Sequence, residues 1–67
     1  MDSPRGMLHT LIGQREKAKK RWDYGNPNAK EDYLKYKKEV ENLLAEHPEL
    51  ESAVETVEDY FLKKLYG

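Results

Sequence analysis

Apolar residues recur at steps of three and four along residues 28–66, the most regular part of this chain. In the first half of that stretch they are Ala29, Tyr33, Tyr36, Val40, Leu43 and Leu44. At about 100° per residue these positions share one face of a helix. They span an arc of roughly 100°, which is the width of a core-facing stripe. The pattern therefore predicts an amphipathic helix over residues 29–46.

The same steps continue in the second half of the stretch, after a break at His47-Pro48. The apolar positions here are Leu50, Ala53, Val54, Val57, Phe61 and Leu65. Pro48 suits the first position of a helix, and it disfavours helical geometry at His47. We therefore expect a second helix over residues 48–66 and a tight corner before it. The alternative is one long helix kinked at Pro48, which would lose the bond to the Leu44 carbonyl.

Signals for the start of the first of these helices favour the corner over the kink. Asn28 is a good N-cap, and Glu31 follows three residues later, as a capping box requires. We therefore expect the Asn28 side chain to cap the helix that begins at residue 29.

A third and more polar helix is expected over residues 4–22, ahead of the other two. Its stripe of apolar residues is interrupted by Arg15. Gly6 and Gly13 each cost about 1 kcal/mol relative to alanine inside a helix. We favour a weak helix that starts late, at His9 or Thr10. The other interpretation is that the glycines allow close approach to another helix.

These elements predict one all-α domain over residues 1–67. The expected fold is a small antiparallel three-helix bundle, or a helical hairpin with a mobile N-terminal helix. A chain of this length buries only about 60% of its unfolded surface, so its stability is marginal. It has no cysteine and two histidines, so neither disulfides nor a thiolate metal site can supplement the core. Helix packing, or association with a partner or a second copy, is what remains.

Charge is distributed unevenly along the chain, although the net charge is only −1. Residues 1–38 contain ten Lys or Arg and five Asp or Glu, a balance of +5. Residues 39–67 contain two Lys and eight Asp or Glu, a balance of −6. Such a chain can pair its two halves or attract a charged partner.

Enzyme chemistry finds no support in the sequence. The four Ser and Thr residues occur in no nucleophile–base motif, and there is no Gly-rich phosphate loop. His47 lies among carboxylates at a helix break, where a cap or surface role is favoured over metal ligation. We predict no catalytic, cofactor-binding or metal-binding residue, and hence no enzyme and no cofactor.

Neither a membrane span nor a secretory signal is expected. The chain has no run of about 18 apolar residues, and its N-terminus lacks an apolar h-region. The expected location is therefore the cytoplasm, without a membrane partner.

A basic segment over residues 15–24 is the best signal for nucleic acid. Lys and Arg can neutralise phosphates, and Trp or Tyr can stack on an unpaired base. The candidate residues are Arg15, Lys17, Lys20, Arg21, Trp22 and Tyr24. Glu16 and Asp23 interrupt the segment, and the chain lacks the high pI of a binding domain. Nucleic-acid binding is therefore the alternative function, and a structural assembly subunit is another.

Aromatic and apolar residues near the C-terminus favour protein–protein interaction instead. Leu62 and Tyr66 lie off the core face of their helix, and Leu34 lies off the face of its own. A helix that is apolar nearly all round is expected to be buried, and three helices cannot cover it. The expected partner-binding residues are Leu34, Phe61, Leu62, Leu65 and Tyr66.

The expected function is therefore that of an adaptor, regulator or inhibitor that self-associates through its C-terminal helix. Two such helices are expected to pair antiparallel, because acidic residues of one copy then face Lys63 and Lys64 of the other. These acidic residues are Glu55, Glu58 and Asp59. Besides the second copy, we expect a protein partner whose identity the sequence does not give.

Overall fold

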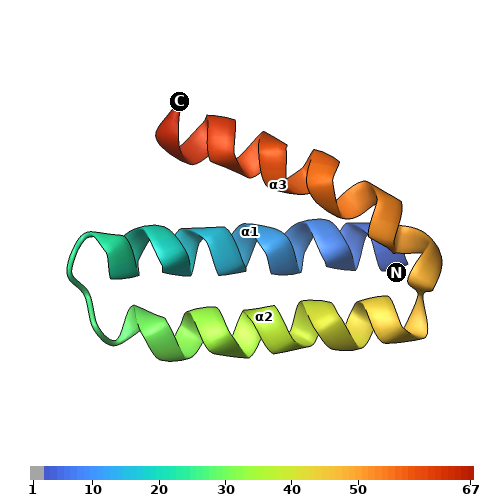
Figure 1. The fold of residues 1–67 in the computed structure, drawn as a ribbon, viewed down its shortest axis with the longest axis horizontal. Helices are drawn as coiled ribbons and strands as arrows, with labels where there is room; N and C mark the ends of the chain where they lie inside the picture. Colours follow the sequence, from blue (N-terminus) through green and yellow to red (C-terminus); the bar gives the residue numbers. More distant parts are fainter. Residues whose placement is uncertain (1–2) are drawn as a thin grey trace.

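Three α-helices and one short 3-10 turn make up the part of the chain that the structure describes. They are α1 (Pro4–Asp23), α2 (Ala29–Glu46), η1 (Pro48–Leu50) and α3 (Glu51–Tyr66). The computed structural model describes residues 3–67, so the first two residues of the predicted domain lie outside the described part. Because α2 runs back along α1 and α3 reverses again after η1, the protein is an all-α antiparallel three-helix bundle (Figure 1).

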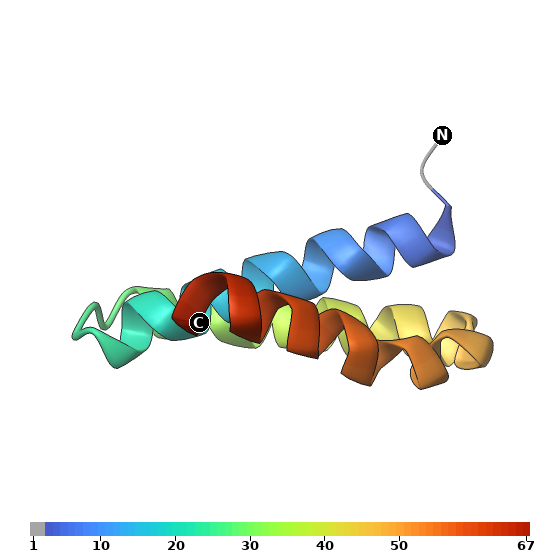
Figure 2. The ribbon, with the colours of Figure 1, turned by 90° about the horizontal axis from the view of Figure 1, so that it is seen from above.

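The central helix of this bundle is α1. It packs extensively on α2 and less extensively on α3, whereas α2 and α3 scarcely touch directly. Figure 1 shows α3 diverging from α1 towards the C-terminus, and Figure 2 shows the N-terminal half of α1 rising away from the other two helices. Since α1 is packed between its neighbours, a hairpin with a mobile first helix is not the observed arrangement.

The hydrophobic core lies where α1 begins, α2 ends and α3 begins. Leu8 and Ile12 of α1 are fully buried, at 0% exposure. The remaining buried members are Val40, Leu43, Leu50, Val57 and Phe61. The periodicity predicted each of these five as core-facing, and the structure confirms them.

The start of α1 agrees with the predicted range of residues 4–22 and not with the late start that the glycines favoured. The helix begins at Pro4, not at His9 or Thr10. The Ser3 hydroxyl accepts a hydrogen bond from the Gly6 N–H at 3.1 Å, and Pro4 occupies the first helical position. Together these two features offset the cost of a glycine in the first turns.

Close approach of a neighbour, the less favoured interpretation of the glycines, is correct for Gly13. Gly13 is buried, and a Cβ at this position would lie 2.6 Å from Cζ of Phe61. The aromatic ring of α3 therefore rests directly on the α1 backbone, which only glycine permits. Gly6 has no such contact, because a Cβ there would meet only Ser3 Oγ at 3.4 Å.

The predicted capping box at the start of α2 is wrong. Asn28 already has helical dihedral angles, φ −67° and ψ −24°, and its side chain makes no capping hydrogen bond. The preceding turn takes that role, because Asn26 Oδ1 accepts from the Asn28 N–H at 3.2 Å. The Asn26 carbonyl then accepts from the Ala29 N–H at 3.1 Å.

The corner at His47-Pro48 is confirmed. His47 leaves the helical region, with φ −131° and ψ 71°, and it separates α2 from η1. Pro48 starts a 3-10 turn in which the Leu50 N–H bonds to the His47 carbonyl at 3.0 Å. The regular α-helix consequently begins at Glu51 and not at the predicted Pro48.

Candidate interaction surface

The last turns of α3 form what we call the C-terminal cuff, comprising Phe61, Leu62, Leu65 and Tyr66. The structure divides the cuff into two sides. Phe61 is buried against α1 and Leu65 is half-buried. Leu62 and Tyr66 remain 42% and 48% exposed on the outer side. The cuff therefore completes the core with one side and offers large apolar groups to solvent with the other.

Leu34, the fifth predicted partner-binding residue, lies elsewhere. It is 48% exposed on α2. Because α1 lies between α2 and the end of α3 (Figure 1), the structure does not bring Leu34 together with the cuff.

The cuff is held against the end of α1 by a lysine. Lys20 Nζ donates a hydrogen bond to the Leu65 carbonyl at 2.6 Å, satisfying one of the free carbonyls of the last turn of α3. The same ammonium lies 5.5 Å from the Tyr66 ring centroid and 5.9 Å from that of Tyr24. A positive charge at a helix C-terminus also complements the helix dipole.

The phenol of Tyr66 stays protonated in this setting. Partial desolvation raises the pKa of Tyr66 above its ordinary value, and the negative charges of Asp23 and Glu16 raise it further. Tyr66 therefore adds no charge to the outer side of the cuff at neutral pH, which suits an apolar contact.

Arg15 joins α1 to α3 in the middle of the bundle. Its side chain is only 12% exposed, and Nη2 donates to Glu16 Oε1 at 2.9 Å and to Glu58 Oε2. Burial lowers the pKa of Arg15, but the bonds to both carboxylates outweigh it, so the net shift is upward. Glu16 is itself buried at 6% exposure, and its Oε2 has no hydrogen-bond partner among the described residues. The guanidinium therefore compensates a buried carboxylate.

This network divides the six candidate nucleic-acid residues. Arg15 and Lys20 are engaged inside the molecule, as described above. Trp22 packs on Tyr33 with ring centroids 5.9 Å apart, and the residue is 38% exposed. The three that remain well exposed are Lys17, Arg21 and Tyr24. The structure therefore leaves a smaller basic surface than the sequence suggests, beside a shallow groove of about 430 Å³.

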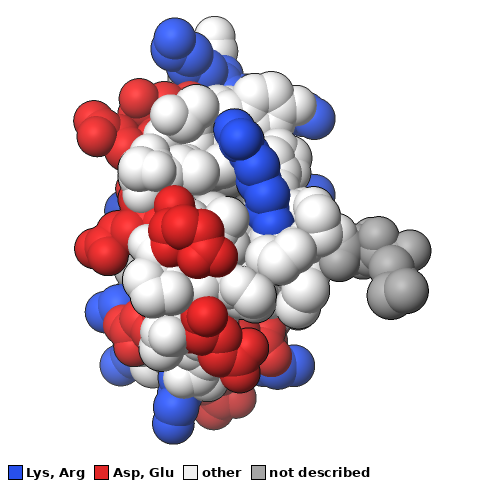
Figure 3. All heavy atoms as spheres, turned by 90° about the vertical axis from the view of Figure 1, so that its right-hand side faces the viewer, with Lys and Arg blue, Asp and Glu red and all other residues white. Residues whose placement is uncertain are grey.

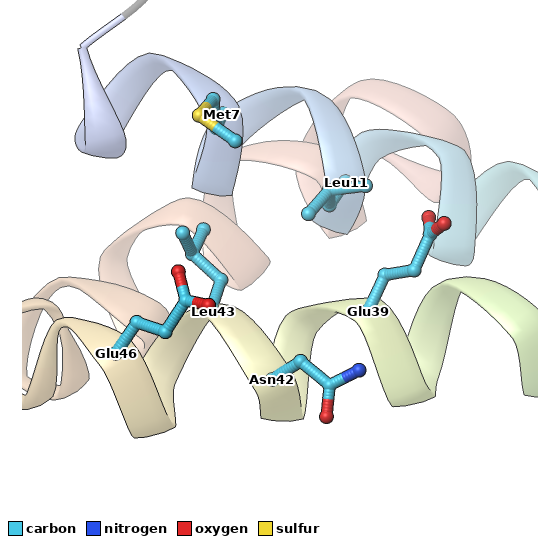
Figure 4. A pocket seen from close by; sticks show the side chains of 6 residues that line it. All are labelled: Met7, Leu11, Glu39, Asn42, Leu43 and Glu46. Atoms are coloured by element: carbon cyan, nitrogen blue, oxygen red, sulfur yellow. The ribbon is translucent and has the colours of Figure 1, made fainter.

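A second groove, which the sequence analysis missed, lies between α1 and α2 (Figure 4). Its volume is about 300 Å³. Met7, Leu11 and Leu43 supply apolar walls, while the polar lining consists of Glu39, Asn42 and Glu46. The signal available in the sequence was Met7, which lies just beside the apolar stripe of its helix and is 44% exposed.

The charge asymmetry of the sequence carries over only in part to the two ends of the molecule. Figure 3 views the end where α2 leads through η1 into α3, and Asp and Glu side chains are spread across it together with several Lys and Arg side chains. The basic residues of α1 cluster towards the opposite end, where Lys20 and Arg21 occupy the last turn of the helix.

Two classes of site are absent from residues 3–67. Within this range, no three His, Asp or Glu side chains gather closely enough to hold a metal ion. None of the helices described there combines the length and the hydropathy needed to cross a bilayer.

Comparison with known proteins gives no relative of this chain. No protein-family model, no curated protein and no solved structure matches it. Its function must therefore be inferred from its surfaces.

Proposed function

We propose that this protein is a non-enzymatic protein–protein interaction module, acting as an adaptor, regulator or inhibitor in the cytoplasm. The observation that carries the proposal is the exposure of Leu62 and Tyr66 beside the buried Phe61. Contiguous exposed apolar side chains are a feature of interaction sites in soluble proteins. Tyrosine is also enriched among the residues that dominate binding energy.

A second copy is the first occupant we propose for the cuff. Glu55 and Asp59 are exposed on the α3 turns that precede the cuff, and Lys63 is exposed beside its members. An antiparallel pair of α3 helices sets acidic turns towards basic ones, whereas a parallel pair sets like charges together. Glu58 contributes less to this pairing, because it is already bonded to Arg15.

Self-association would also supplement a small core. The buried apolar groups of this chain are few, and a bundle of this length is only marginally stable by itself. Each α3 end covered by a partner removes apolar surface from water, which stabilises the folded state by mass action.

Nucleic-acid binding remains the alternative, on the exposed Lys17, Arg21 and Tyr24. Tyr24 is 77% exposed and is available for stacking on a base. We rank it lower because Arg15 and Lys20 are engaged in internal bonds. A structural assembly subunit would use the cuff as well, but in an open series of contacts.

Sedimentation equilibrium tests the proposal. At physiological salt we expect the wild type to associate at high micromolar concentration, and a Leu62→Lys/Tyr66→Lys variant to associate far more weakly because its cuff no longer binds a second copy. The matched control is Ser52→Lys/Thr56→Lys, which adds the same two charges to exposed positions of α3 outside the cuff.

A wild type that stays monomeric at high micromolar concentration would exclude the dimer. A protein partner recovered from the native host would then be tested on the same variants. If Leu62→Lys/Tyr66→Lys bound that partner as tightly as the control does, the cuff would have no role in binding.

A further inference from the structure

The outward face of α2 carries a second ordered set of residues, which we call the α2 outer stripe. It consists of Leu34, Lys38, Glu41 and Ala45, all of them exposed. Their spacing of four, three and four residues places them in one narrow band along the helix. Val40 and Leu43, which face α1, lie on the opposite side of α2.

No other described part of the chain uses this stripe. Among residues 3–67, neither Lys38 nor Glu41 takes part in an ion pair or a side-chain hydrogen bond. Leu34 leaves nearly half of its surface in water, at 48% exposure. The stripe is therefore an unpartnered helix face on the outer edge of the molecule, with α1 behind it (Figure 1).

The side chains of the stripe complement those of a second, antiparallel copy of the same stripe. Along the chain the order is large apolar, basic, acidic, small apolar. When two α2 helices cross antiparallel, Leu34 of each copy meets Ala45 of the other. In the same register Lys38 of each copy meets Glu41 of the other. We propose that the α2 outer stripe binds a second copy of this chain in this antiparallel arrangement.

Other registers are unfavourable for the same reason. A parallel pair would set Lys38 against Lys38 and Glu41 against Glu41, which costs energy at every charged layer. An antiparallel pair shifted by one heptad would set Leu34 against Lys38 and Glu31 against Glu41. Charged residues at seam positions select one register of paired helices in this way.

The size of the residues fits the same register. Ala45 leaves room for the Leu34 side chain of the partner, so the two helix axes can approach closely at both ends of the contact. In the central layers the aliphatic stems of Lys38 cover apolar surface, while the ammonium groups reach the carboxylates. Four layers form a small interface, so we expect a weak dimer that dissociates as salt rises.

This inference goes beyond the proposed function, because it uses a different surface. The cuff lies at the end of α3, and α1 separates it from the α2 outer stripe. A dimer joined through α2 leaves both cuffs uncovered, so they stay available to a protein partner or to further copies, and pairing through both surfaces would join copies in an open series. Linked sites of this kind bind a repeated partner more tightly than either site alone.

Reversing the charges of Lys38 and Glu41 tests the proposal. All variants are made in the Leu62→Lys/Tyr66→Lys background, so that the cuff does not contribute to dimerisation. Lys38→Glu and Glu41→Lys are each expected to weaken the dimer by on the order of tenfold, because each turns two attractions into two repulsions. The Lys38→Glu/Glu41→Lys double variant restores both attractions and should dimerise like its parent. So should a 1:1 mixture of the two single variants, in which each copy complements the other.

Sedimentation equilibrium at low salt measures all of these species, and circular dichroism checks that each remains helical. Restored association in the mixture cannot arise from misfolded single variants. A weak dimer has a Kd on the order of 1 mM. The proposal is therefore overturned if the parent is still monomeric at a protein concentration of about 1 mM. It is also overturned if the single reversals leave association unchanged, or if the mixture associates no better than its components.

Discussion

The two ends of this bundle are built differently. The corner end, where α2 turns through η1 into α3, holds Leu8, Ile12, Val40 and Leu43 of α1 and α2 in one buried cluster. The loop end, around residues 24–28 and the last turn of α3, buries far less. The corner end therefore provides most of the buried apolar packing, whereas the loop end leaves more of its apolar side chains exposed.

Small residues explain why the loop end buries little apolar surface. Its buried positions are Ala18 and Ala29, which let α1 and α2 approach but contribute little apolar area. Trp22 and Tyr33 pack on each other at the edge and remain in contact with solvent. The chain reverses there through Gly25, whose φ of 95° favours glycine.

The core and the exposed side of the cuff lie at different ends of α3, and this matters for binding. At the corner end, α3 is fixed by burial of Val57 and Phe61, and the exposed Glu51, Glu55 and Asp59 lie on its outer turns. At the loop end α3 is held to α1 by the bond from Lys20, and the outer side of the cuff is exposed. A partner can therefore engage the cuff without disturbing the core.

The largest expected effect is from a charge placed in the corner core. Val57 is 6% exposed, so Val57→Asp buries an unpaired carboxylate and costs about 3 kcal/mol or more. That is comparable with the whole stability of a chain of this size. We expect the variant to be unfolded by far-UV circular dichroism.

Thr56→Asp is the matched control, because it puts the same charge on the neighbouring exposed position. It should retain helicity and unfold cooperatively. A fully helical Val57→Asp variant would show that the opposite face of α3 is the buried one.

Periodicity alone predicted much of the corner end. Apolar steps of three and four identified the core faces of α2 and α3, and Pro48 identified the corner. These features depend on local sequence and on side-chain type, which a sequence displays directly. Arg15 was different, because its partner Glu58 is 43 residues away and only the packing of α3 on α1 brings the two together.

A smaller effect is expected in the middle of the bundle, where Arg15 joins α1 to α3. Arg15→Ala removes the partner of the buried Glu16, leaving a carboxylate without compensation, and should cost about 2 kcal/mol. Lys19→Ala, an exposed neighbour, should change the free energy of unfolding by no more than about 0.5 kcal/mol. Urea denaturation of both variants provides the measurement. Equal midpoints would mean that the Arg15 network does not stabilise the bundle.

The smallest expected effects on stability come from replacing the two glycines of α1 by alanine, and each substitution serves as the control for the other. Gly6→Ala meets no close neighbour and should stabilise the protein by about 1 kcal/mol, through helix propensity. Gly13→Ala forces its Cβ into the Phe61 ring, so overpacking should exceed that gain and destabilise by about 1 kcal/mol. Thermal unfolding compares them. Stabilisation by both substitutions would contradict the close contact between α1 and Phe61.

The caps and the glycines mark the limit of what the sequence could predict about the fold. Asn28 fits the capping box by type, but the turn at Asn26 had already placed it inside helical geometry. Gly13 resembled a helix-weakening residue until the position of Phe61 on α3 was known. For the candidate surface, helical angles predicted that Leu62 and Tyr66 leave the core face. They could not predict that Leu34 would lie on a separate edge.

Residue-resolved amide hydrogen exchange tests the difference between the two ends most directly. Under native conditions we expect the slowest exchange in the corner core, at the amides of Ile12, Leu43 and Phe61, which open only on global unfolding. Amides at Ala18 and Ala29 should exchange through local opening at a much lower free energy. Equal protection at both ends, or slower exchange at Ala18 and Ala29 than in the corner core, would contradict the account.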